Sequence, residues 1–179
     1  MSRPPVARQK LLDAFIRILI DEGERAATVE AVAARAGVSK GGLLYHFGSK
    51  NALVEGLLDL LSEAAEADVV AMRAAPEGAV AHYLRTSGTG DDQLKDLYVA
   101  ASRLTQDHGR RAGERLAAIE QGWYAVLVET VGDPVRAKLI QLIGDGLYLN
   151  SIVADQAAQS STPTAELITA VDTLIVRPQ

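Results

Sequence analysis

The chain has 179 residues, a formal net charge of −5, no cysteine, and a hydrophobic fraction of 48%, which is ordinary for a globular protein. The lack of cysteine excludes disulfides and thiolate metal sites, and no apolar run approaches the roughly 18 residues of a transmembrane helix. With no signal peptide recognised, we expect a cytoplasmic protein without a metal or other cofactor. Scarce aromatic residues, at 4%, and abundant Ala and Leu favour an all-α fold.

The charges are divided unevenly along the chain. Residues 1–50 hold eight Lys/Arg and five Asp/Glu, which gives +3, whereas residues 51–179 hold ten and eighteen, which gives −8, and the sum is −5. A basic N-terminal part attached to an acidic body indicates that only the N-terminal part meets phosphates.

The spacing of apolar residues and helix breakers predicts nine helices. The first covers 6–22 and ends at Gly23, Thr28 and Ser39 are the expected N-caps of the next two, and a long fourth helix begins at about residue 49. Five further helices are separated by expected breaks at 74–78, 86–92, 108–113, 132–134 and 160–163.

Residues 28–50 (TVEAVAARAGVSKGGLLYHFGSK) are the most informative segment, because they predict two short helices joined by a tight turn. One interpretation is an ordinary core of packed helices. Gly41 and Gly42, however, each cost about 1 kcal/mol relative to Ala inside a helix, and they suit a backbone that must approach DNA closely. Hydroxyl, cationic and aromatic groups gather in and around the second helix, namely Ser39, Lys40, Tyr45, His46 and Lys50. The segment therefore predicts DNA binding through the major groove.

The stretch AGVSKGGLLYHFGSKNAL is similar to the DNA-binding signature of TetR-family transcriptional regulators, whose usual form is close to AGVSKGTLYYHFPSKEAL. The resemblance is specific over residues 8–58 and architectural beyond them. It implies that Thr28 holds a phosphate, that Tyr45 and His46 reach backbone or base edges, and that Lys50 neutralises a phosphate. The base-facing first turn of the recognition helix would be Ser39, Lys40, Gly41 and Gly42.

The chain departs from that signature at three positions. Gly42 stands where Thr is frequent, Leu44 where Tyr is frequent, and Asn51 where Glu is usual. Fewer polar groups therefore remain on the recognition helix, and Lys40 together with close backbone approach would carry much of the base readout.

The expected organisation is a helix-turn-helix DNA-binding domain over 1–50 and a helical ligand-binding and dimerisation domain over 51–179, linked by the fourth helix. A dimer is expected because two such domains about 34 Å apart can read a palindrome. Two apolar segments, 135–154 and 164–176, qualify as its surface, although both also suit plain core helices. The resemblance implies a four-helix bundle across a two-fold axis, with the candidate residues Ile140, Ile143, Gly144, Leu147, Leu167, Ile168, Val171 and Leu174.

The segment 77–131 is the expected sensor of a small-molecule effector. Trp123, the sole tryptophan, suits either an apolar pocket or plain core. The candidate pocket residues are Tyr83, Tyr98, Arg103, Trp123, Leu147 and Asn150.

Enzymatic activity is not expected, because thiols, nucleophile-elbow motifs and phosphate-cradling glycine loops are missing and the three His lack the spacing of metal ligands. The sequence predicts a dimeric repressor that a small-molecule effector releases from a palindromic DNA operator. Two alternatives stay open: the same architecture without a small-molecule ligand, acting through a protein partner or constitutively, and a helical interaction module with a vestigial helix-turn-helix.

Overall fold

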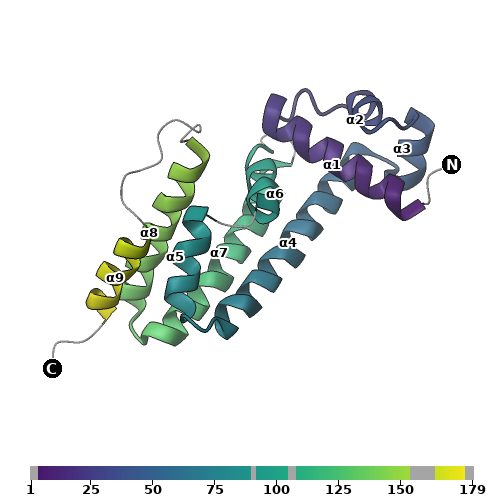
Figure 1. Cartoon of the computed structure of the whole chain (residues 1–179). Coiled ribbons are helices and arrows are strands. Elements are labelled where there is room, and N and C mark those ends of the chain that lie inside the picture. The colour runs from purple at the N-terminus through teal and green to yellow at the C-terminus, as the bar shows by residue number, and fades with distance from the viewer. Residues whose placement is uncertain (1–3, 90–91, 105–107, 154–163, 176–179) are drawn as a thin grey trace. The chain divides into compact units, whose positions relative to one another are not determined.

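The computed structural model describes residues 4–89, 92–104, 108–153 and 164–175, which form nine helices and contain no strand (Figure 1). The expected all-α class is confirmed. The helices are α1 (Pro4–Glu22), α2 (Val29–Ala36), α3 (Lys40–Phe47), α4 (Lys50–Ala74), α5 (Ala79–Thr89), α6 (Asp92–Ser102), α7 (Gly109–Val131), α8 (Pro134–Val153) and α9 (Thr164–Ile175). Among them, none has an apolar stretch long enough to cross a membrane.

Most helix boundaries follow the local signals of the sequence. α1 ends at Gly23, whose φ of +82° lies in the left-handed region that favours glycine. The Thr28 hydroxyl accepts a hydrogen bond from the Ala31 N–H at 3.1 Å and so caps α2. The Ser49 hydroxyl caps α4 in the same way, through the Ala52 N–H at 3.2 Å.

The predicted break at 108–113 differs from the structure. α6 ends at Ser102 and α7 begins at Gly109, so that Gly113 lies inside α7. A single glycine costs a helix about 1 kcal/mol but does not end it, and Ala112 and Ile119 continue the buried face on either side. The predicted break at 160–163 lies outside the described residues.

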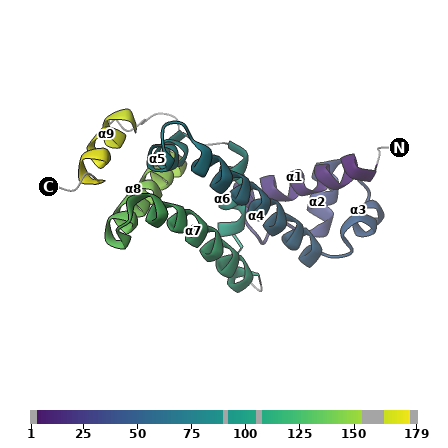
Figure 2. The ribbon, with the colours of Figure 1, turned by 90° about the horizontal axis from the view of Figure 1, so that it is seen from below.

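Contacts between Cα atoms divide the chain into two compact units. Unit 1 comprises Met1–Ala64 with Asp92–Ala118, and unit 2 comprises Ala65–Asp91 with Ile119–Gln179. In unit 1, α1 packs against α2, α3 and α6 (Figure 2). Its core contains the fully buried side chains Leu11, Leu12, Phe15, Leu19, Leu43, Leu53, Leu57, Leu58 and Leu61. The expected domain division at residue 50 stays a prediction.

In unit 2, α5 lies against α8 and α9 (Figures 1 and 2). The core combines residues of five helices: Met72, Ala79, Val80, Tyr83, Leu84, Val126, Leu127, Ala137, Ile140 and Val171. Gly144 lies where α8 meets α5, because a Cβ there would be 2.8 Å from Cζ of Tyr83 and 3.0 Å from Oγ of Ser87. This glycine therefore permits close packing of two helices within one chain.

The side chains predicted for the dimer interface pack largely within unit 2. Ile140, Gly144 and Val171 are buried. Ile143, Leu147 and Ile168 are half-buried against the core cluster, and Leu167 is also half-buried. Leu174 belongs to α9, but its side chain lies outside the described ones. The apolar side chains that α8 exposes are a different set: Val135, Leu139, Leu142, Leu149 and Ile152.

Candidate nucleic-acid interface

A tight turn joins α2 to α3. Gly37 adopts the left-handed conformation, with φ 66° and ψ 31°, and its N–H donates to the carbonyls of Ala33 and Ala34. The Val38 N–H donates to the Ala33 carbonyl at 2.9 Å, and the Ser39 hydroxyl accepts from the Gly42 N–H at 3.1 Å. These bonds terminate α2 and start α3 within three residues, and they fix the direction of the second helix.

The inner faces of the two helices anchor them in unit 1. Val32 and Leu43 are completely buried and Phe47 is 6% exposed. The Arg8 guanidinium of α1 lies 5.0 Å above the centre of the Phe47 ring, a cation–π contact between the first and third helices. The outer face of α3 is thereby held in one orientation.

The outer face of α3 carries few polar groups. Tyr45 is 83% exposed and Leu44 is 40% exposed, and the His46 ring meets the Tyr45 ring edge-on with centroids 5.3 Å apart. Lys40 and Gly41 are exposed at the start of the helix. Tyr45 is the most exposed side chain of this face, and its contact with DNA stays a prediction.

The two adjacent glycines of α3 have different surroundings. A Cβ at Gly41 would meet nothing within 4 Å, so the backbone there is open to an approaching surface. A Cβ at Gly42 would lie 2.8 Å from Cγ1 of Val38 and 3.2 Å from Oγ of Ser39. A side chain at Gly42 would therefore crowd the residues of the turn, whereas the absence of a side chain at Gly41 leaves the backbone of the outer face uncovered.

The two lysines predicted to contact DNA both have partners in the structure. The Lys40 ammonium lies 2.8 Å from the Glu30 carboxylate of α2, with both side chains well exposed, and this hydrogen bond lowers the pKa of Glu30. The half-buried Lys50 donates to the carbonyl oxygen of Glu24 at 3.0 Å. Lys50 therefore joins the start of α4 to the loop between α1 and α2. Thr28 and Ser39, although exposed, also serve as helix caps.

The predicted ligand residues are divided between the two units. In unit 2, the rings of Tyr83 and Trp123 lie 6.5 Å apart, and Leu147 packs against the same core cluster. Asn150 lies on α8 and is exposed. In contrast, Tyr98 and Arg103 belong to unit 1.

Two carboxylates that the sequence analysis did not select accompany these aromatic rings. Asp68 accepts from the Trp123 indole N–H at 2.9 Å and lies 3.3 Å from Nε2 of His82. The Tyr83 hydroxyl donates to Asp145 at 3.3 Å. Loss of water raises the pKa of Asp145, and burial, followed by the Asp145 charge, raises the pKa of Tyr83 above its ordinary range. No local sequence signal joins these residues, because they come from four helices.

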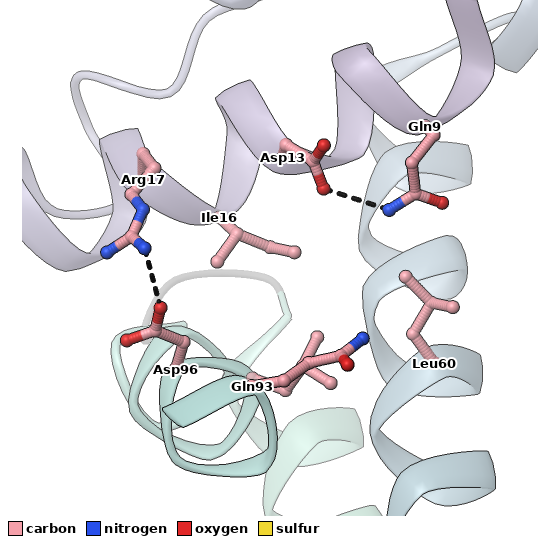
Figure 3. Close-up of a pocket in the computed structure, with 8 residues that line it drawn as sticks. Gln9, Asp13, Ile16, Arg17, Leu60, Gln93 and Asp96 are labelled. Carbon is pink, nitrogen blue, oxygen red and sulfur yellow. Dashed lines mark hydrogen bonds and ion pairs between the residues drawn. The ribbon is translucent and has the colours of Figure 1, made fainter. Parts of the chain in front are cut away.

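A cavity of about 470 Å³ lies within unit 1, between α1, α4 and α6 (Figure 3). The Arg17 guanidinium meets the Asp96 carboxylate at 2.9 Å, and the Gln9 amide donates to Asp13 at 2.8 Å (Figure 3). Ile16, Leu60 and Leu97 contribute apolar surface. Because Gln9 pairs with Asp13 and Arg17 pairs with Asp96, these four groups do not identify a ligand.

Comparisons with known proteins match both the helix-turn-helix and the whole chain. Residues 11–57 match the family model of bacterial regulatory proteins, tetR family. The chain is 28% identical to the HTH-type transcriptional regulator BetI of Serratia proteamaculans over 92% of each chain. It is 37% identical to BetI of Rhizobium meliloti over 62% of this chain and 55% of that protein, so this second alignment spans about half of the relative.

Two solved structures are similar over nearly the whole chain. The multidrug binding protein EbrR complexed with malachite green has a TM-score of 0.71 and 25% identity, covering 95% of this chain and 98% of EbrR. NalD, the secondary repressor of the MexAB-OprM multidrug efflux pump in Pseudomonas aeruginosa, has a TM-score of 0.74 and 17% identity, covering 97% of each chain. The second likeness concerns the fold alone.

Proposed function

Since the chain belongs to the TetR family of transcriptional regulators, we propose that it is a dimeric repressor that a small-molecule effector releases from a palindromic operator. Members of this family are DNA-binding transcription factors rather than enzymes. The observation that carries the proposal is the rigidly capped α3, whose inner face is buried while Tyr45 and the open backbone at Gly41 face outwards. The proposed place of action is the cytoplasm.

In the proposed complex, the first turn of α3 enters the major groove. The Lys40 ammonium and the Lys50 side chain would face phosphates and release counterions, which makes affinity depend on salt. Tyr45, His46 and the backbone at Gly41 would contact base edges and sugars, and Thr28 would contact a phosphate at the start of α2. Lys40→Ala should therefore weaken binding and reduce the slope of log affinity against log salt by about one. A matched control is Lys138→Ala, which removes an exposed lysine of α8 in unit 2.

The proposed dimer surface is the exposed apolar face of α8. Val135, Leu139, Leu142 and Leu149 are 71%, 53%, 55% and 58% exposed, and together with Gly146 they follow a spacing of four, three, four and three residues. This is the spacing of a seam between two packed helices. A Cβ at Gly146 would meet nothing within 4 Å, so a helix of a second copy has room to approach. Among the residues that the structure describes, this apolar face is left exposed, which supports pairing through α8.

The proposed effector site lies in unit 2, beside Tyr83 and Trp123. Asp68 and Asp145 place carboxylates next to these aromatic rings, so an aromatic ligand carrying a cationic or hydrogen-bond-donating group suits the site. EbrR, which is similar over nearly the whole chain, was solved in complex with malachite green. This similarity supports the proposal that the present chain also binds a small molecule. α4 runs from unit 1 into unit 2. We therefore propose that effector binding acts through α4 and changes the distance between the two DNA-binding domains of the dimer.

Two measurements on the full chain test the proposal. A duplex recovered by selection from random DNA should bind wild-type protein more tightly than Lys40→Ala or Tyr45→Ala, whereas a vestigial helix-turn-helix predicts equal and weak binding. A compound library should yield molecules that raise the melting temperature by mass action and that also lower affinity for the duplex. A regulator that acts without a small molecule would give tight DNA binding but no such compound.

A further inference from the structure

Four residues of α3 form a single exposed stripe. Lys40, Gly41, Leu44 and Tyr45 are all exposed, and residues three or four positions apart are neighbours on the surface of a helix. Leu43, which lies between them in the sequence, turns inwards and is completely buried. The four residues therefore present one continuous surface, which we call the α3 stripe.

Leu44 places an aliphatic side chain on the α3 stripe. Its exposed fraction is 40%, and among the described residues of α2, the turn and α3, the exposed large hydrophobic side chains are Leu44 and Tyr45. Gly41, one turn earlier, has no atom within 4 Å of the position that a Cβ would take, so the surface beside Leu44 is open. A single exposed leucine is ordinary on a protein surface, and its role therefore depends on what this stripe meets.

Leu44 differs from its neighbours in the chemistry that it can recognise. Lys40 and Tyr45 carry polar atoms that can hydrogen-bond to a base edge, whereas a leucine side chain has neither a donor nor an acceptor. In the major groove the bases present donors, acceptors and one apolar group, the C5 methyl of thymine. A leucine pressed against polar base atoms would remove them from water without satisfying them, which costs free energy. The thymine methyl is therefore the feature that suits Leu44.

We propose that Leu44 is a specificity-determining residue, which selects thymine at one position of each operator half-site by packing against the C5 methyl group. The inference rests on the proposed function, in which this face of α3 enters the major groove. Where the related signature frequently has Tyr, the chain has Leu44, so an apolar surface replaces a hydroxyl group. The base selected at this position thus follows from a departure from the signature.

The first experiment compares duplexes that differ only in thymine methyl groups. A duplex is recovered from random DNA with the full-length wild-type protein, and each thymine of one half-site is replaced in turn by uracil, which pairs in the same way but lacks the methyl group. Fluorescence anisotropy then gives the affinity for each duplex. At one position, wild-type affinity should fall roughly two- to fivefold, the loss expected when one buried methyl group is removed.

The second experiment repeats the uracil series with variants of Leu44. Leu44→Ala removes the apolar surface and should make the affinity insensitive to uracil at that position. Leu44→Met keeps an apolar side chain of similar volume and should retain the sensitivity. The matched control Val70→Ala shortens an aliphatic side chain that is 66% exposed on α4 in unit 2, and it should behave like wild type. Any effect of uracil on the shape of the DNA is common to all proteins and cancels in this comparison.

The outcomes separate the role of Leu44 from the proposed function. If the wild-type protein enriches a duplex but Leu44→Ala and wild type respond alike to uracil at every thymine, the role of Leu44 is excluded and the proposed function stands. A sensitivity that persists in Leu44→Ala and disappears in Tyr45→Ala would also overturn the proposal, because Tyr45 would then contact the methyl group. If the wild-type protein enriches no duplex, the proposed function fails and the role of Leu44 fails with it.

Discussion

The Lys40 ammonium and the Glu30 carboxylate form an ion pair of 2.8 Å between the two helices of the helix-turn-helix. The cation proposed to meet DNA therefore has a competing partner within the protein. Both side chains are largely exposed, so the pair adds little stability, but under the proposed function the Glu30 charge would lie beside the lysine that meets a phosphate.

Glu30→Gln should strengthen DNA binding, because it removes a negative charge beside Lys40 and releases the ammonium for a phosphate. We expect a severalfold gain in affinity at low salt that shrinks as salt is added, since screening weakens interactions between exposed charges. Fluorescence anisotropy with a selected duplex measures the effect. Glu66→Gln, the same change at an exposed position of α4 in unit 2, should leave affinity unchanged, and an equal gain there would show that only net charge matters.

Gly144→Ala should destabilise the protein, because the added methyl would overlap the Tyr83 ring and approach the Ser87 hydroxyl. Overpacking of this kind costs about 1–3 kcal/mol, and denaturant titration of the full chain measures it. Gly113→Ala is the matched control, since Gly113 lies inside α7 with nothing within 4 Å of its Cβ position. That change should stabilise by up to about 1 kcal/mol. Equal effects of the two changes would contradict the close α5–α8 contact.

Leu142→Glu should convert the proposed dimer into a folded monomer. Leu142 is 55% exposed in the single chain, so the charge meets water in the monomer but faces its own copy in a dimer formed through α8. Sedimentation velocity gives the oligomeric state, and circular dichroism checks the fold. Val70→Glu places the same charge on a 66% exposed residue of α4 and should leave the dimer intact. A Leu142→Glu protein that stays dimeric would exclude this seam.

Asp145→Asn should raise the melting temperature at neutral pH, and the gain should disappear in acid. The folded state raises the pKa of Asp145, mainly through loss of water. Its carboxyl group therefore favours folding while protonated and opposes folding as pH rises through the folded-state pKa. The increase should be small, because Asp145 is exposed and solvent screens its interactions. A difference from wild type that is independent of pH would contradict this assignment.

The helices of the helix-turn-helix were predictable because their signals are local. Thr28, Gly37 and Ser39 each act on backbone groups within five residues, so the sequence alone indicates where α2 and α3 begin and end. The same local signals identify the candidate nucleic-acid interface. The partner of Lys40 was not predictable, because Glu30 lies on the preceding helix and meets it only once the turn is folded.

The assignment of faces in α8 shows where sequence reasoning stops. Its apolar residues cover more than half of the helix, and periodicity cannot say which side meets α5. The structure turns Ile140 and Gly144 towards the core and leaves Leu139 and Leu142 exposed. The contact of His108 with Glu24 and Asn51 was equally hidden, because it joins segments far apart in the chain.

The central claim, that the exposed face of α3 reads operator DNA as part of a dimer, is tested most directly by selecting bound duplexes from random DNA with the full-length protein. The account predicts enrichment of a palindrome whose half-site centres lie about 34 Å apart, and loss of the enrichment in Tyr45→Ala. Recovery of unenriched sequences by the wild-type protein, or the same palindrome from Tyr45→Ala at equal affinity, would contradict it.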